Sequence, residues 1–202
     1  MGILHEKGMV KNSGSKTAKT FESLFDDIDF EHVQYSSPKE YITLYWDKYK
    51  EKKGLSNNAM NGNIFEIIIY TLLYREGLIP FYTQAKVAFV PNIEFDTILY
   101  TPSKPISLSL KTSLRERYKQ ADLEAIALVH VHRKAKSYLL TLDPNEAAIC
   151  KSKIQSGEII GLDRIIDCNT SDIDDLISEL KIIQNELQIS PVVEVIKGNL
   201  IK

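Results

Sequence analysis

The segment from Ile64 to Arg75 is apolar on nearly every face when it is drawn as a helix, and Gly77 provides a stop signal just after it. A helix that is apolar all round belongs in the centre of a fold rather than on its surface. The segment is too short to span a membrane, which takes about 20 apolar residues. We therefore predict a central helix with other elements packed around it.

Glu66 interrupts this apolar segment and has two interpretations. A buried carboxylate without a partner costs considerable free energy. It is tolerated near the start of a helix, where the helix dipole favours negative charge. Otherwise it needs a partner or a function. The residues of this segment alone leave both interpretations open.

Three runs with strand composition follow the central helix, at 86–90, 93–100 and 106–111. Pro91-Asn92 is a turn dipeptide, so the first two runs are predicted to form a hairpin. The third run alternates cleanly between polar and apolar residues. Asp96 lies inside the second run although aspartate is depleted in strands, and Lys111 ends the third. If these two strands are antiparallel neighbours, Asp96 and Lys111 face the same groove.

The remaining pattern predicts helices and strands around this core. Ser37 is the expected N-cap of a helix over 38–53 that ends at Gly54. We read residues 57–63 as turns, and residues 1–20 as a flexible N-terminal arm. The other predicted elements are a short helix within 21–35, helices over 114–125, from 144 and over 171–187, and strands over 126–132, 137–142 and 164–168. This order predicts one α/β (α+β) domain over 1–202, with a central mixed sheet flanked by helices.

Composition and charge constrain the compartment and the partners of the protein more than the reaction that it catalyses. The net charge of −2 does not indicate a nucleic-acid partner, but the basic residues that contact DNA can be confined to one part of the surface. Two cysteines, Cys150 and Cys168, fit no metal-binding spacing and are expected to be reduced. The first 20 residues lack an apolar core followed by a small-residue cleavage site. We therefore expect a cytoplasmic protein.

The candidate chemistry is carried by Asp96, Lys111 and Glu124, the last on the helix predicted after the third strand. Carboxylate oxygens suit a hard divalent cation such as Mg²⁺. Such an ion makes a bound water more acidic and offsets charge on a phosphate. A lysine beside it orients the water or neutralises developing charge. This combination is what hydrolysis of a phosphodiester requires.

Asp96 followed by Ser109-Leu110-Lys111 resembles the core of the PD-(D/E)XK nucleases, which is typical of type II restriction endonucleases. Ser109 stands where the family usually carries an acidic residue. A subset of restriction enzymes has this Ser-X-Lys pattern with a compensating glutamate on the next helix, spaced as Lys111 and Glu124 are. Glu66 fills the place of a glutamate that the family commonly carries in a preceding helix. The resemblance covers about residues 62–142, the expected catalytic core.

The resemblance implies a site-specific, Mg²⁺-dependent endonuclease acting on double-stranded DNA. Asp96 and Glu124 would bind the metal, Lys111 would position the water, and Ser109 would line the site without acting as a nucleophile. Glu66 would be an auxiliary metal contact. The candidate DNA contacts are Lys111, Arg115, Arg117 and Lys119.

The resemblance also implies a homodimer and a cognate DNA methyltransferase in the same system. One choice stays open, because Asp122 competes with Glu124 as the displaced acid. Two rival functions also stay open. One is a nuclease of DNA repair or mobile elements, and the other is a catalytically inactive member of the fold that only binds DNA.

Overall fold

The computed structural model describes residues 2–26, 28–53, 58–90, 92–191 and 195–202. These residues form a six-stranded mixed sheet with the order β5-β4-β3-β2-β1-β6. β3 is parallel to β4 and β4 to β5, whereas β3-β2, β2-β1 and β1-β6 are antiparallel pairs. The predicted α/β architecture is confirmed. The strands are β1 Phe81–Val87, β2 Phe95–Leu99, β3 Ile106–Lys111, β4 Lys136–Thr141, β5 Arg164–Asp167 and β6 Val195–Ile201.

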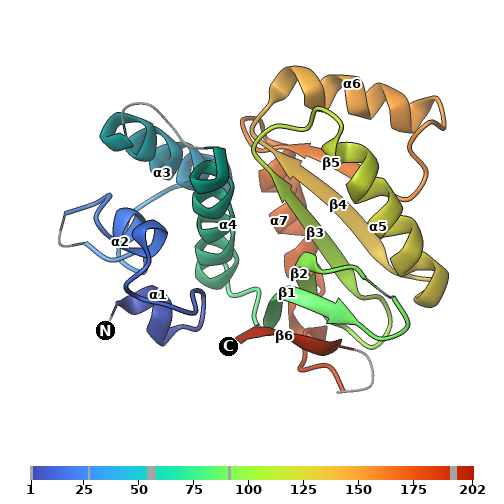
Figure 1. The fold of residues 1–202 in the computed structure, drawn as a ribbon, viewed down its shortest axis with the longest axis horizontal. Helices are drawn as coiled ribbons and strands as arrows, with labels where there is room; N and C mark the ends of the chain where they lie inside the picture. The colour runs from blue at the N-terminus through green and yellow to red at the C-terminus, as the bar shows by residue number, and fades with distance from the viewer. Residues whose placement is uncertain (1, 27, 54–57, 91, 192–194) are drawn as a thin grey trace.

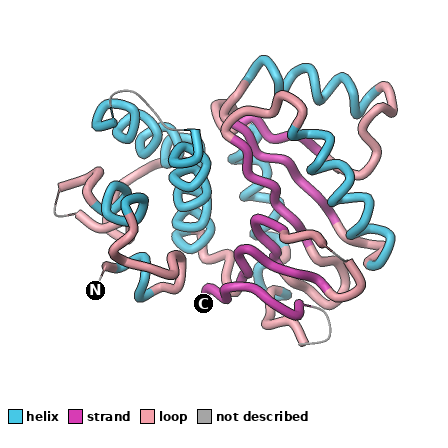
Figure 2. The backbone as a smooth tube through the Cα atoms, in the orientation of Figure 1, coloured by secondary structure: helices cyan, strands magenta, loops and turns pink. Residues whose placement is uncertain are grey.

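Helices cover both faces of this sheet (Figure 1). α4 contacts β3 and α7 contacts β5 on one face, whereas α5 and α6 pack on the other. Figure 2 shows the strands as one twisted layer between the two sets of helices. The helices are α1 Ile3–Glu6, α2 Lys16–Glu22, α3 Pro38–Lys53, α4 Asn58–Arg75, α5 Arg117–Val131, α6 Pro144–Gln155, α7 Asp172–Ile182 and a 3₁₀ turn over Gln184–Glu186.

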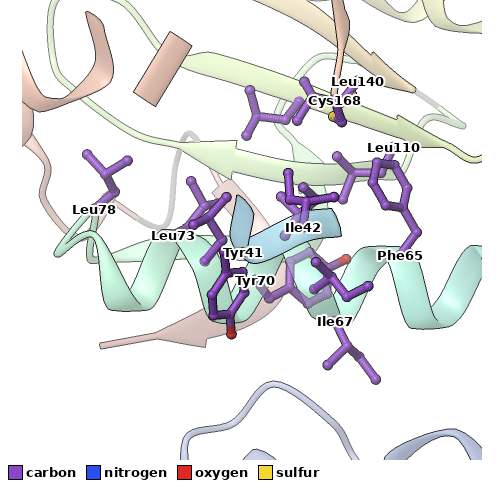
Figure 3. Packing of buried hydrophobic residues seen from close by; sticks show 14 of the residues in the cluster. Tyr41, Ile42, Phe65, Ile67, Tyr70, Leu73, Leu78, Leu110, Leu140 and Cys168 are labelled. Carbon is purple, nitrogen blue, oxygen red and sulfur yellow. The ribbon is translucent and has the colours of Figure 1, made fainter. Parts of the chain in front are cut away.

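The predicted central helix is confirmed as part of α4. Its apolar side chains pack between α3 and the sheet, and Figure 3 shows Phe65 beside Leu110 of β3. Gly77 has a φ of +72°, a left-handed conformation that glycine adopts without steric cost. The Leu78 N–H donates to the Leu73 carbonyl oxygen at 2.9 Å, which closes the helix. Sequence and structure therefore agree on where α4 ends.

The start of α4 differs from the prediction and changes the meaning of Glu66. Residues 58–63, predicted as turns, form the first turns of α4, because its buried face outweighs their weak helix propensity. Glu66 consequently lies inside the helix, where the dipole no longer explains a carboxylate. Residue 57 and the predicted helix stop at Gly54 lie outside the described residues.

The prediction for residues 112–132 was partly wrong. α5 begins at Arg117 rather than at residue 114, and it continues through the segment predicted as a strand over 126–132. Ala121, Ala125 and Leu128 form one buried helical face across the supposed boundary. The parallel pairing of β3 with β4 also requires a crossover connection, which α5 supplies.

The predicted flexible arm is also wrong, because the N-terminal segment packs on the fold. Leu4 and Ala18 are fully buried, and the Phe21 ring stacks on Tyr45 with 4.9 Å between ring centroids. The short helix expected within 21–35 is also wrong, because α2 ends at Glu22 and the described residues from 23 to 35 form turns and irregular structure. At the other end, β6 pairs with β1 and has no counterpart in the predicted elements. β1 itself begins at Phe81 and ends at Val87, earlier than the predicted run.

Several local predictions are confirmed. The Ser37 hydroxyl accepts the Glu40 N–H at 3.2 Å and caps α3. The hairpin of β1 with β2 forms, and β3 has the predicted bounds. The helix predicted from residue 144 is α6, which Asp143 caps, and both cysteines are free, as expected. No helix in the described ranges is long and apolar enough to cross a membrane.

Candidate active site

Asp96 and Lys111 meet where β2 and β3 run side by side. The antiparallel register pairs Thr97 with Leu108, which sets the preceding Asp96 beside the end of β3. The Lys111 Nζ donates to Asp96 Oδ2 at 2.7 Å. The side chains are 16% and 21% exposed, so the pair is sheltered yet reachable from solvent. The prediction that these two side chains come together is confirmed.

Two further donors hold the same carboxylate oxygen. The Leu110 N–H donates to Asp96 Oδ2 at 2.7 Å, and the Ser109 hydroxyl lies 3.4 Å from that atom. Charge-assisted hydrogen bonds of this kind fix the orientation of a carboxylate. Asp96 is therefore positioned before any ligand arrives.

Glu66 approaches the pair from α4. The Tyr70 hydroxyl lies 3.3 Å from Glu66 Oε2 and 3.2 Å from the backbone oxygen of Asp96, which ties α4 to β2. Burial raises the pKa of Glu66 to about 7, the negative charge of Asp96 adds to this, and Lys111 and the Tyr70 hydroxyl act against it. Glu66 thus changes protonation near neutral pH.

Glu124 approaches from α5 on the other side. Gln120 Nε2 donates to Glu124 Oε1 at 2.7 Å. Burial raises the pKa of Glu124, and Asp96 adds to the rise, whereas the Gln120 hydrogen bond and the charge of Lys111 lower it. Since Glu66 and Glu124 both respond to Asp96 and Lys111, the four residues form one electrostatic unit built from α4, β2, β3 and α5.

Asp122, the alternative to Glu124, is engaged elsewhere. It is buried, and its Oδ1 accepts the backbone N–H groups of Ile160, Gly161 and Leu162 at 3.1, 2.6 and 3.2 Å. A Cβ on Gly161 would lie 2.5 Å from the Asp122 backbone oxygen, so only glycine permits this close approach. Asp122 docks the loop before β5 onto α5, whereas Glu124 is the acid whose pKa the charge of Lys111 lowers.

The donor set suits a hard divalent cation. Asp96 contacts Lys111, and Glu66 and Glu124 interact electrostatically with the same pair, so the ionised set carries excess negative charge that such a cation would offset. Within the described ranges, no three His, Cys, Asp or Glu side chains form a cluster that could hold a metal ion together. Mg²⁺, however, usually binds through one or two carboxylates, with waters and substrate phosphates completing its coordination.

Of the predicted DNA-contacting residues, Lys111 lies in the site and the other three lie outside it. Arg115, Arg117 and Lys119 are exposed on the loop after β3 and on the first turn of α5. Lys119 forms an ion pair with Glu116. The Glu146 carboxylate accepts the backbone N–H of Arg115 at 2.8 Å and so fixes the loop that follows Lys111.

Sequence reasoning missed the part played by Tyr70. The signal was available, because Tyr70 follows Glu66 by four residues and residues so spaced are neighbours on a helix. Burial is the main cause that raises the pKa of Tyr70 well above its usual value, so its hydroxyl remains a donor. Tyr70 therefore couples the position of Glu66 to that of Asp96.

Glu66→Gln tests this electrostatic description through stability. Wild-type Glu66 is protonated at low pH in both folded and unfolded states, but above pH 7 the folded state must hold a charge that the unfolded state holds easily. Because the pKa of Glu66 is raised in the folded state, the free energy of unfolding falls as the pH rises from about 4.5 through 7, by up to about 3 kcal/mol. We expect the free energy of unfolding of the variant to exceed that of wild type by about 2 to 3 kcal/mol at pH 8 and by about 1 kcal/mol or less at pH 5.

Urea unfolding at the two pH values, with EDTA present, measures this difference. The same advantage at both pH values would contradict the raised pKa and point to a packing effect instead. Glu6→Gln is the matched control, because it makes the same substitution at an exposed residue of α1.

Comparison of the chain with protein-family models, with curated proteins and with solved structures gave no match. A functional assignment therefore depends on the geometry of the site itself. That geometry consists of a lysine bound to an aspartate at neighbouring strand ends, with one glutamate approaching from each flanking helix layer.

Proposed function

We propose that this protein is a Mg²⁺-dependent endonuclease that hydrolyses phosphodiester bonds of double-stranded DNA at a short recognition sequence, as type II restriction enzymes do. The observation that carries the proposal is the 2.7 Å contact between Lys111 Nζ and Asp96 Oδ2, flanked by Glu66 and Glu124. Acidic oxygens and a cationic donor at one sheltered, reachable point suit a reaction in which a water attacks a negatively charged phosphate.

Each residue has a distinct role in this proposal. Asp96 and Glu124 hold the metal, and Glu66 is an auxiliary oxygen donor beside them. When bound, Mg²⁺ supplies a Lewis acid for the phosphate and makes a coordinated water more acidic. Lys111 orients the attacking water and donates a hydrogen bond to the phosphate as its charge grows. Ser109 lines the site and is not a nucleophile.

The proposal also includes partners. Arg115, Arg117 and Lys119 are exposed cations beside Lys111, where they would contact DNA phosphates. A homodimer would act on both strands of a palindromic site. A DNA methyltransferase of the same system would protect the DNA of a prokaryotic host, in whose cytoplasm both would work.

Cleavage of unmethylated phage DNA tests the function. The purified chain should yield discrete fragments with Mg²⁺ and none when EDTA is added. Cleavage confined to nicked, mismatched or branched DNA would favour a repair or mobile-element nuclease. Binding without cleavage of any substrate would favour an inactive, DNA-binding member of the fold.

A further inference from the structure

A polar cleft of about 280 Å³ adjoins the candidate site and shares Glu66 and Tyr70 with it. Its walls come from the N-terminal segment, α4, β1 and β6, elements far apart in the sequence. Most of its lining side chains are uncharged and able to both donate and accept hydrogen bonds. Among them are Asn12, Ser15, Asn63, Gln84 and Asn199, together with the cation Lys11.

Gln84 is aimed at this cleft by an irregular strand. Its φ is +48°, which is uncommon for a residue other than glycine. The pairing of β1 with β6 shifts register between Thr83 and Lys86, as at a β-bulge. Bulges redirect side chains and are frequent beside active sites, and strained backbone persists where surrounding structure enforces it. The strand thus departs from regular geometry at the point where Gln84 lines the cleft.

Lys11 meets Gln84 across the cleft. The Lys11 Nζ donates to Gln84 Oε1 at 3.0 Å, which joins the N-terminal segment to β1. No carboxylate forms an ion pair with Lys11 among the residues that the structure describes. A lysine has three donors and a glutamine amide has two, so both side chains keep donors available for a ligand. The pair presents one positive charge and one amide edge, held relative to each other.

We propose that this cleft seats the stretch of DNA strand next to the scissile phosphate, with Lys11 on a backbone phosphate and Gln84 on a base edge. An ammonium group neutralises a phosphate, and a glutamine amide pairs with the donor and acceptor of adenine. The cleft and the candidate site share Glu66 and Tyr70, which places the two side by side. This inference rests on the proposed nuclease function and identifies residues that determine specificity.

Lys11→Ala tests the phosphate contact. Binding of a labelled, mixed-sequence DNA duplex is measured by fluorescence anisotropy over a range of salt concentrations, with Ca²⁺ replacing Mg²⁺. The slope of log K against log salt should lose about 0.9, the value for one phosphate contact. Lys50→Ala is the matched control, because Lys50 is also exposed but lies on α3, where it pairs with Asp47. Its slope should equal that of wild type.

Gln84→Asn tests base readout. Asparagine tolerates positive φ well, so the fold should be kept. Its side chain is one methylene shorter, so the amide no longer reaches the base edge. Cleavage of phage DNA should then spread to sites that differ at one base pair, with discrimination at that position reduced by about 5- to 100-fold. Thermal unfolding of both cleft variants checks that they fold as wild type does.

The outcomes separate this inference from the function on which it rests. A wild-type protein that neither binds nor cuts DNA overturns both. A wild-type protein that cuts DNA, with Lys11→Ala keeping the full salt slope and Gln84→Asn keeping the original cleavage pattern, overturns the cleft assignment alone. A reduced slope with Lys11→Ala and a relaxed pattern with Gln84→Asn support it.

Discussion

Replacing Asp96 by asparagine is expected to lower the rate of DNA cleavage by about 10²- to 10³-fold without unfolding the protein. Asparagine keeps an oxygen that can accept the Leu110 N–H, so the local hydrogen bond survives. It loses the negative charge that faces Lys111 and that the proposal assigns to the metal. Single-turnover cleavage with Mg²⁺ measures the effect, and thermal unfolding of the same preparation shows that the fold is retained.

Ser109→Ala is the matched control for this prediction. Ser109 lies 3.4 Å from Asp96 Oδ2 and helps to orient it only weakly. We expect loss of the Ser109 hydroxyl to lower the cleavage rate by less than about 10-fold. A contact this long contributes much less free energy than a well-formed hydrogen bond to a charged group. Wild-type rates in the asparagine variant, or a loss in Ser109→Ala as large as that in Asp96→Asn, would contradict the assigned roles.

Glu124→Gln and Asp122→Ala should have opposite effects, although the residues are two positions apart on α5. Glu124→Gln should lower cleavage by about 10²-fold and leave stability equal or slightly higher, because burial disfavours the charge that it removes. The folded Asp122→Ala variant should cleave DNA at the wild-type rate, but its free energy of unfolding should be about 3 kcal/mol lower. That cost reflects three backbone N–H groups that lose a charged acceptor.

Urea unfolding and single-turnover cleavage of both variants measure this contrast. Cleavage is assayed at a temperature where Asp122→Ala is still folded, so that unfolding is not mistaken for lost chemistry. A stable but inactive Asp122→Ala together with an active Glu124→Gln would show that the displaced acid is Asp122 instead.

The candidate site was predictable because its parts are local patterns. The alternation in 106–111 sets the bounds of β3, and the composition of 93–100 predicts β2. Given those two strands, the contact between Asp96 and Lys111 requires only that they pair antiparallel, as they do. The central position of α4 likewise follows from its composition.

The misplaced elements depend on contacts that are distant in sequence. Ile126, Val129 and Val131 have strand-type side chains, yet they belong to α5, which packs on β3 and β4 through a helical stripe. α1 and α2 are too short to be stable alone, and burial of Leu4 and Ala18 against the core holds them in place. β6 exists because β1 offers an edge to pair with, which its own residues do not encode.

The choice between Asp122 and Glu124 could not be made from the sequence either. Both flank the apolar stripe of their helix, so a helical wheel does not separate them. The loop over residues 160–162 favours Glu124, because its N–H groups engage Asp122. That loop is almost 40 residues further along the chain, and no local pattern links it to α5.

The most direct test compares wild-type protein and Lys111→Ala, purified in parallel, on unmethylated phage DNA with Mg²⁺. The site described here predicts discrete fragments from the wild type and intact DNA from the variant, because Lys111 Nζ is the cationic donor at the centre of the site. Intact DNA with both folded proteins, or equal cleavage by both, would contradict the assignment of this site as a nuclease centre.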